Sequence, residues 1–161
     1  MSCDVDDAPE RVLLCTDGVS SETAARLEGT HGWRVRRIES LPNPHAASAR
    51  VPARFRDTFT KLRVWELDEY ERVLLLDADT LVLRPLTVAL WHAEVAPTRL
   101  AAVPDCCDRF NSGVVLLRPD RRVFADMRSK LAALPSYDGG DQGFLVVGFF
   151  LLCVKRLCDS I

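Results

Sequence analysis

The order of apolar and polar residues in the first third of the chain predicts a strand, a helix and a second strand. Residues 11–15 form a short apolar run closed by a Thr-Asp-Gly turn, which is typical of a buried strand. A helix should follow, capped by Ser20 or Ser21 and ending near Gly29. Residues 33–39 then alternate apolar side chains with arginines, as a strand near a sheet edge does. The proline-rich residues 41–52 predict a surface connection.

The same alternation continues through the rest of the chain. Apolar residues at steps of three and four mark one face of a helix, and a second apolar stripe marks a later helix entered through Pro119 and Asp120. Strands are expected at residues 72–76, 100–103 and 113–117. The stripes are Phe55, Phe59, Leu62 and Trp65 in the first helix and Val123, Met127, Leu131 and Leu134 in the second. This pattern predicts an α/β fold, with a mostly parallel sheet flanked by helices, in one domain over residues 1–161.

Composition narrows the class of protein. The 161 residues are 48% apolar and 27% charged, which suits one ordinary globular core, and the formal charge of −2 gives no positive field to draw nucleic acid. The longest apolar run, residues 144–154, is shorter than the ~20 residues that a membrane-spanning helix needs, so it predicts a buried helix or strand. Six scattered cysteines and a polar first segment without a secretory signal favour free thiols in the cytoplasm.

Two carboxylates at the end of an apolar strand are the strongest chemical signal. Residues 72–83 read RVLLLDADTLVL, a run typical of a strand buried on both faces, interrupted by Asp77 and Asp79. Side chains two residues apart on a strand point the same way, and Ala78 between them is small enough to let a ligand approach. The two carboxylates would repel each other unless a cation lay between them, so a divalent metal, Mn²⁺ or Mg²⁺, bound to substrate phosphates is expected here.

The same motif also fits a different enzyme class. Haloacid-dehalogenase-like phosphatases present an aspartate nucleophile at a strand end and a second acid two residues later. In that alternative Asp77 would attack phosphorus and Asp79 would protonate the leaving group. Such a protein should carry this strand near its amino terminus, whereas Asp77 comes almost halfway along the chain.

Three further segments carry groups suited to a sugar diphosphate. Lys61 lies in TKLRVWELDEY on the predicted helix just before the strand, where its ammonium could meet a phosphate. The segment FNSG supplies an amide, a hydroxyl and a glycine that admits close contact, from Asn111, Ser112 and Gly113. The segment YDGGDQGFL folds tightly at its glycines and gathers polar groups, which come from Asp138, Gly140, Asp141 and Gln142. Asp141 is also expected to cap the helix that follows.

Taken in order, these segments resemble glycogenin and its relatives in glycosyltransferase family 8, over residues 55–147. The resemblance implies a GT-A fold, a UDP-sugar donor with glucose as the sugar, Mn²⁺, and hexosyl transfer to a hydroxyl acceptor with retention of configuration. It implies that Asp77 and Asp79 bind the metal and that Asp141 and Asp138 are the catalytic carboxylates. The donor-binding residues that it implies are Lys61, Ala78, Asn111, Ser112, Gly113, Gly140 and Gln142.

The chain also departs from the family pattern. The first strand and loop that hold the uridine, and the late H-x-x-G-x-x-K-P-W segment with its third metal ligand, have no counterpart in the sequence. We therefore expect an incomplete GT-A domain with weak or no turnover. The non-enzyme alternative is a catalytically inactive relative of the family. The alternative to a cytoplasmic location is the Golgi lumen, if an amino-terminal anchor has been lost. The chain could also form a homodimer.

Overall fold

A computed structural model of the chain describes residues 9–49, 51–83, 86, 100–106, 109–150 and 155–156. The chain divides into two compact units, Met1–Ser40 and Leu41–Ile161. In the described residues the first unit holds a two-stranded sheet and the second a four-stranded sheet. The single domain expected over residues 1–161 stays a prediction.

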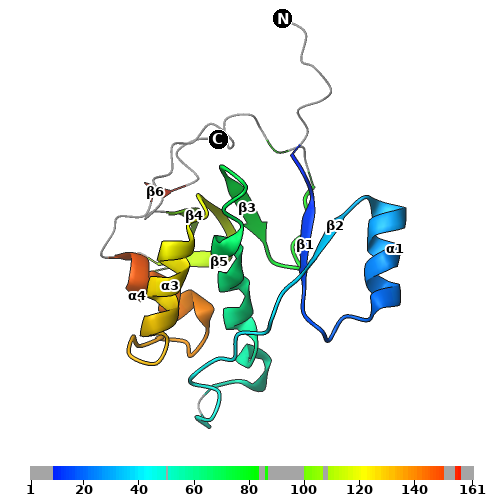
Figure 1. Cartoon of the computed structure of the whole chain (residues 1–161). Coiled ribbons are helices and arrows are strands. Elements are labelled where there is room, and N and C mark those ends of the chain that lie inside the picture. The colour runs from blue at the N-terminus through cyan, green and yellow to red at the C-terminus, as the bar shows by residue number, and fades with distance from the viewer. Residues whose placement is uncertain are drawn as a thin grey trace, which may run out of the picture. The chain divides into compact units, whose positions relative to one another are not determined.

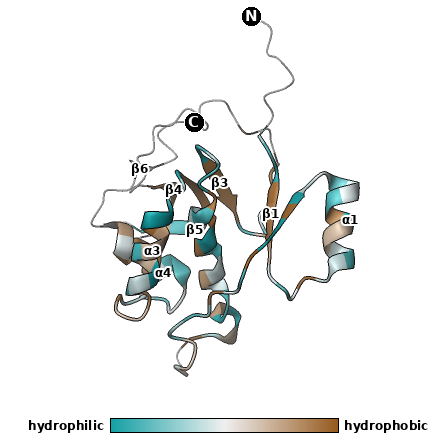
Figure 2. Ribbon diagram, viewed as in Figure 1, coloured by the Kyte–Doolittle hydropathy of each residue, from teal (hydrophilic) through white to brown (hydrophobic). Residues whose placement is uncertain are grey.

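The first unit is a strand, a helix and a strand, drawn toward the blue end of the colour bar in Figure 1. β1 (Val12–Cys15) pairs in parallel with β2 (Arg34–Arg37), and α1 (Ser21–His31) connects them. This is the order that the apolar pattern predicted. Figure 2 shows β1 coloured as hydrophobic, in keeping with its VLLC sequence.

The two ends of α1 follow ordinary capping chemistry. The side chain of Ser20 accepts a hydrogen bond from the backbone N–H of Thr23 at 3.1 Å, so the predicted N-cap is confirmed. The helix continues past Gly29 and ends at Gly32, whose φ of 62° is the left-handed conformation that closes many helices. The predicted end was therefore three residues early, because an exposed glycine inside a helix weakens it without stopping it.

The sheet of the second unit has the strand order β3-β5-β4-β6. Its central strand β5 runs antiparallel to both β3 and β4, whereas β6 is parallel to β4. The strands are β3 (Val73–Leu76), β4 (Leu100–Pro104), β5 (Phe110–Leu117) and β6 (Lys155–Arg156).

The strand directions correct the expectation of a mostly parallel sheet. Residues 105–109 join β4 to β5, and a connection of this length can only reverse the chain, since parallel neighbours need a crossover of a dozen or more residues. β3 also differs from its prediction as a strand buried on both faces. In the described sheet it pairs with β5 alone, and its four residues are half-buried.

Helices pack on this sheet, and the contact of α4 with β5 brings the YDGGDQGFL motif close to the FNSG motif. α4 contacts β5 and η3, and α3 contacts η3. These elements are η2 (Ala53–Phe55), η3 (Thr58–Glu66), α3 (Arg121–Lys130) and α4 (Asp141–Phe150). Asp120 caps α3, as predicted, by accepting a hydrogen bond from the N–H of Arg122. The α/β class with helix-covered sheets is therefore found, although α3 ends before the predicted apolar stripe does.

η3 is a 3₁₀-helix whose apolar residues recur every third position. Phe59, Leu62 and Trp65 are all 0% exposed. Residues three positions apart lie on one face of a helix with three residues per turn, so these side chains form its buried face. The ring centroid of Phe59 lies 5.4 Å from that of Phe144, and Trp65 stacks on Phe149 at 5.7 Å. These aromatic contacts fix η3 against α4.

The apolar run over residues 144–154 forms the later turns of α4 up to Phe150, and residues 151–154 lie outside the described ranges. In the part of the chain that the structure describes, no helix is long and apolar enough to cross a membrane.

Candidate active site

Asp77 stands directly after β3 and is held there by the neighbouring strand. Its backbone N–H donates to the carbonyl oxygen of Gly113 in β5 at 2.8 Å, and its own carbonyl accepts from Thr80 at 2.9 Å. The chain therefore turns immediately after the strand. The Asp77 side chain is about one-third exposed, at 36%, and Ala78 and Asp79 are exposed. The turn thus presents the second carboxylate to solvent.

Lys61 connects two of the motifs through its ammonium. Its Nζ lies 2.7 Å from Asp77 Oδ1 and 2.9 Å from Asp141 Oδ2, and its side chain is only 16% exposed. Burial lowers the pKa of Lys61, but the carboxylates of Asp141 and Asp77 outweigh it and raise the pKa above its ordinary value. The residue is therefore a protonated cation shared between two carboxylates at neutral pH.

Asp141 is the most enclosed acidic group of the site. It is the first residue of α4 and is 5% exposed, and its Oδ2 accepts a hydrogen bond from Ser112 Oγ at 2.8 Å. Ser112 is 4% exposed, and its Oγ also lies 3.4 Å from Lys61 Nζ. A negative charge in the first turn of a helix is favoured by the helix dipole. The carboxylate is consequently held in one place by a hydroxyl, an ammonium and a helix end.

Gly113 allows β5 to approach the strand end closely. A Cβ at this position would lie 2.9 Å from Asn111 Oδ1 and 3.0 Å from Asp77 Oδ2, both of which are tighter than ordinary contacts. The N–H of Gly113 donates to Asn111 Oδ1 at 2.7 Å. The space that this glycine leaves is therefore filled by side chains of the chain itself, where sequence reasoning expected a ligand to approach.

Asp138 organises the loop before α4. Its Oδ1 accepts hydrogen bonds from Ser136 Oγ at 2.7 Å, from the N–H of Gly140 at 2.9 Å and from the N–H of Gly143 at 3.0 Å. It thereby satisfies backbone donors at the start of α4, which is the capping role that had been expected of Asp141. The correction arises because Asp141 lies inside the helix, where its side chain turns to Lys61 and Ser112.

Gln142 joins the FNSG strand to the same loop. Its Oε1 accepts from the N–H of Ser112 at 3.2 Å, and its Nε2 donates to Asp105 Oδ2 at 3.2 Å and to the Tyr137 hydroxyl at 2.8 Å. The guanidinium carbon of Arg109 lies 3.9 Å from the centroid of the Tyr137 ring. Sequence reasoning did not name Asp105, Arg109 or Tyr137 as site residues, although Tyr137 falls inside the YDGGDQGFL motif.

Asn43 is a second contributor that the sequence did not reveal. It is 4% exposed, and its Nδ2 donates to the carbonyl of Phe55 at 2.9 Å and to that of Gly139 at 2.7 Å. Gly139 has a φ of 75°, and Val51 Cγ2 lies 2.6 Å from where its Cβ would be. The predicted surface connection over residues 41–52 therefore packs against the loop that leads to Asp141.

Asp77 and Asp79 have the donor chemistry that a hard divalent cation requires. Mg²⁺ is usually held by one or two carboxylates together with substrate phosphates and water, so two aspartates at a strand end are a sufficient protein contribution. In the described residues no group of three or more His, Cys, Asp and Glu side chains could hold a metal ion. The oxygen donors thus fit a cation shared with a ligand and do not form a closed protein cage.

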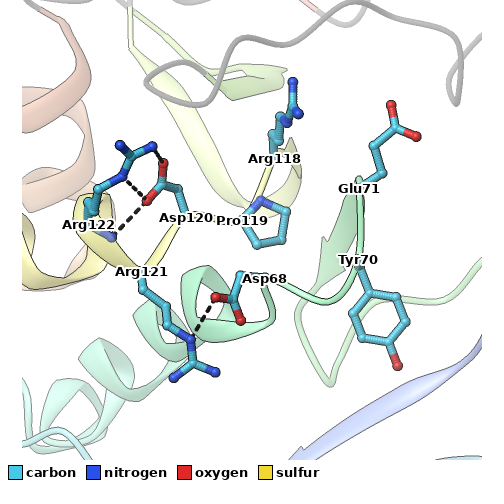
Figure 3. A pocket seen from close by; sticks show the side chains of 8 residues that line it. All are labelled: Asp68, Tyr70, Glu71, Arg118, Pro119, Asp120, Arg121 and Arg122. Atoms are coloured by element: carbon cyan, nitrogen blue, oxygen red, sulfur yellow. Dashed lines mark hydrogen bonds and ion pairs between the residues drawn. The ribbon is translucent and has the colours of Figure 1, made fainter.

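A pocket of about 440 Å³ lies elsewhere on the second unit, as Figure 3 shows. Tyr70 and Glu71 come just before β3, and Arg118 follows β5, so the pocket is at the opposite end of these antiparallel strands from Asp77 and Gly113. Its other charged groups pair within the wall, Arg121 with Asp68 and Arg122 with Asp120, each at 2.8 Å. Mutually paired surface charges give no reason to place the chemistry here.

The sequence of the chain matches known proteins over most of its length. The family model described as Glycosyl transferase family 8 matches residues 13–145. Inositol phosphorylceramide glucuronosyltransferase 1 of Arabidopsis thaliana is 36% identical over 142 residues, which are 88% of this chain and 25% of that protein. UDP-glucuronate:xylan alpha-glucuronosyltransferase 2 of the same plant is 33% identical over 134 residues, 83% of this chain and 21% of that protein. The chain thus spans about a quarter of the length of these relatives.

A solved structure shows the same fold. The apo structure of the bifunctional glycosyltransferase WbbM is similar with a TM-score of 0.65 and 17% identity, over 98% of this chain and 40% of that chain. At this identity the likeness is one of fold alone. The expected fold class, a partial glycosyltransferase fold of the GT-A kind, is confirmed.

Proposed function

Because the chain belongs to glycosyl transferase family 8, we propose that it forms the donor-binding part of an enzyme that moves a sugar from a UDP-sugar to a hydroxyl group, with retention of anomeric configuration. The observation that carries this proposal is the position of the Lys61 ammonium, 2.7 Å from Asp77 and 2.9 Å from Asp141. The Lys61 ammonium thereby links Asp77, at the strand end that would face the diphosphate, to Asp141, the carboxylate that would face the sugar.

UDP-glucuronate is the donor that we propose, in place of the UDP-glucose implied by the resemblance to glycogenin. The support comes from the names of the relatives. One is an inositol phosphorylceramide glucuronosyltransferase and another is a UDP-glucuronate:xylan alpha-glucuronosyltransferase. For this chain the acceptor is proposed only as a hydroxyl group.

Asp77 and Asp79 would hold a Mn²⁺ or Mg²⁺ ion against the diphosphate of the donor. Such an ion, when bound, neutralises negative charge on the departing phosphate. Asp77 stays in place because β5 and Lys61 fix its backbone and its Oδ1, and Asp79 is exposed two residues later. The two residues therefore differ in role: the first is anchored and the second adapts to the ligand.

Asp141 would stabilise the positive charge that develops at the anomeric carbon as the bond to phosphate breaks. Its carboxylate is buried and held by Ser112 and Lys61, so it needs no reorganisation during the reaction. Our mechanism is a front-face attack in which the acceptor hydroxyl gives its proton to the leaving phosphate oxygen. Trapping a covalent glycosyl adduct on Asp141 would contradict this mechanism.

Binding measurements test the proposal directly. We expect calorimetry on the purified chain to show uptake of UDP-glucuronate that requires Mn²⁺, and Asp77→Asn to weaken it by at least about tenfold. Asp126→Asn, which removes an exposed carboxylate from α3, is the matched control and should bind as the parent chain does. Thermal unfolding of both variants checks that they fold.

Each rival has its own outcome. Binding of inorganic phosphate with Mg²⁺, in the absence of UDP binding, would favour the phosphatase alternative. Unchanged metal and UDP binding by Asp77→Asn would favour the inactive relative. A parent chain that takes up no UDP compound with Mn²⁺ would reject the proposed function.

A further inference from the structure

Arg109 stands at the edge of the candidate site on a fixed piece of backbone. It immediately precedes β5 and comes two residues before Asn111. Its carbonyl accepts from the N–H of Asp105 at 2.8 Å, and its own N–H donates to the carbonyl of Cys106 at 3.3 Å. These two hydrogen bonds hold the backbone of Arg109 at the start of β5.

The guanidinium of Arg109 is held over an aromatic ring that is itself held. Its carbon lies 3.9 Å from the Tyr137 ring centroid, which is a close cation–π contact. The Tyr137 hydroxyl accepts from Gln142 Nε2, and Gln142 is the residue after the buried Asp141. This contact restricts the positions that the guanidinium can take.

Among the described residues the charge of Arg109 is not neutralised by an ion pair, in contrast to three other arginines of the second unit. Arg63, Arg121 and Arg122 each form an ion pair with an acidic side chain. In the described ranges Arg109 has no such pair, and it is exposed. Its N–H donors are consequently available to an anionic ligand.

The charge around it explains why such a cation would matter. The site carries carboxylates at Asp77, Asp138 and Asp141, and Asp105 lies beside Gln142. The ammonium of Lys61 is already shared between two of them. A donor sugar with a carboxylate of its own would be repelled unless a further cation met it, and a planar guanidinium matches a carboxylate in two parallel hydrogen bonds.

We propose that Arg109, stacked on Tyr137, is the residue that recognises the carboxylate of a hexuronic acid donor and so sets donor specificity. This inference rests on the proposed function. It goes further by assigning discrimination between UDP-glucuronate and UDP-glucose to one named side chain.

The test compares three nucleotides on the purified chain with Mn²⁺: UDP, UDP-glucose and UDP-glucuronate. We expect the parent chain to bind UDP-glucuronate more tightly than UDP-glucose. Arg109→Met should weaken UDP-glucuronate binding by about 10–100-fold, because a charge-assisted pair is lost, and should change UDP-glucose binding by less than about twofold. Arg109→Lys keeps the charge without the planar fork, so it should recover only part of the loss. Arg128→Met, at an exposed position on α3, is the matched control and should change none of these affinities.

The outcomes separate the two proposals. If Arg109→Met weakens both sugar nucleotides equally, the assignment of Arg109 is overturned and the proposed function stands. If UDP binds but the parent chain does not prefer UDP-glucuronate, the assignment of Arg109 and the proposed donor sugar are both overturned, whereas the proposed use of a UDP-sugar stands. If the parent chain binds no UDP compound, the proposed function fails and this inference fails with it.

Discussion

Replacing Gly143 with alanine should destabilise the second unit, although alanine favours a helix. A Cβ at Gly143 would collide with Asp138 Oδ1 and Ser136 Oγ and would lie 2.7 Å from the backbone nitrogen of Tyr137. Backbone cannot swing away as the end of a long side chain can. The loop before α4 would therefore have to move as a unit.

The size of the effect follows from the hydrogen bonds at stake. Asp138 Oδ1 accepts from Ser136, Gly140 and Gly143, and a hydrogen bond to a charged group contributes about 1.5–3 kcal/mol. Losing one of the three costs about 1.5–3 kcal/mol, and about 1 kcal/mol of improved helix propensity offsets part of this loss. The free energy of unfolding should therefore fall by about 0.5–2 kcal/mol, and by more where the other two hydrogen bonds weaken as well.

Gly148→Ala is the matched control in the same helix. Among the described residues its Cβ would meet only Leu134 Cδ1, at 4.0 Å, so we expect up to about 1 kcal/mol of stabilisation. Urea unfolding of the parent chain and both variants measures the difference. If Gly143→Ala were as stable as Gly148→Ala, the tight packing of Asp138 at the start of α4 would be refuted.

Four further substitutions test three separate parts of the structure. Lys61→Met removes the cation shared by Asp77 and Asp141 and should lower the free energy of unfolding by about 2–4 kcal/mol in urea titrations. The pKa of Lys61 is raised in the folded state, so this stabilisation is present in full below the ordinary pKa of 10.5 and is lost as the pH rises through the raised pKa. The difference in free energy of unfolding between the parent chain and Lys61→Met should therefore narrow only above pH 10.5. Asn43→Asp replaces the amide nitrogen, which donates to two carbonyl oxygens, with a carboxylate oxygen that can only accept, so the free energy of unfolding should fall by about 2–4 kcal/mol. An unchanged melting temperature would contradict the role of this residue. At Gly29 no atom of the described residues lies within 4 Å of an added Cβ, so Gly29→Ala should stabilise α1 by up to about 1 kcal/mol. Gly32→Ala, at a φ of 62°, should destabilise α1 by a similar amount, as thermal unfolding will show.

Local chemistry made much of the fold predictable from the sequence. Ser20 and Asp120 cap α1 and α3 because a short oxygen-bearing side chain there can reach a backbone N–H that has no helical partner. The spacing of Phe59, Leu62 and Trp65 revealed a buried face, although their strict three-residue step indicates the 3₁₀ form more closely than an α-helix. Each of these signals lies within a few residues of the feature that it predicts.

Contacts between distant segments were harder to predict. Asn43 and Gly139 are 96 residues apart, and a buried asparagine between two prolines looks the same in sequence as an exposed turn residue. Arg109 likewise resembles any surface arginine until the fold sets it on Tyr137. The antiparallel direction of β5 could have been inferred, since residues 105–109 are too few for a crossover.

The role of Lys61 shows how the structure changes the interpretation of a correctly chosen residue. The sequence predicted that the ammonium of Lys61 would contact a phosphate, whereas in the fold it lies between Asp77 and Asp141. Lys61, Asp77 and Asp141 together carry a net charge of about −1, and Asp79 adds another negative charge. A nucleotide diphosphate is itself an anion, so it would be repelled from this strand end unless further positive charge accompanied it. The geometry therefore strengthens the proposal of a divalent cation at Asp77 and Asp79. Tight binding of UDP to the chain in the presence of a chelator would remove that reason.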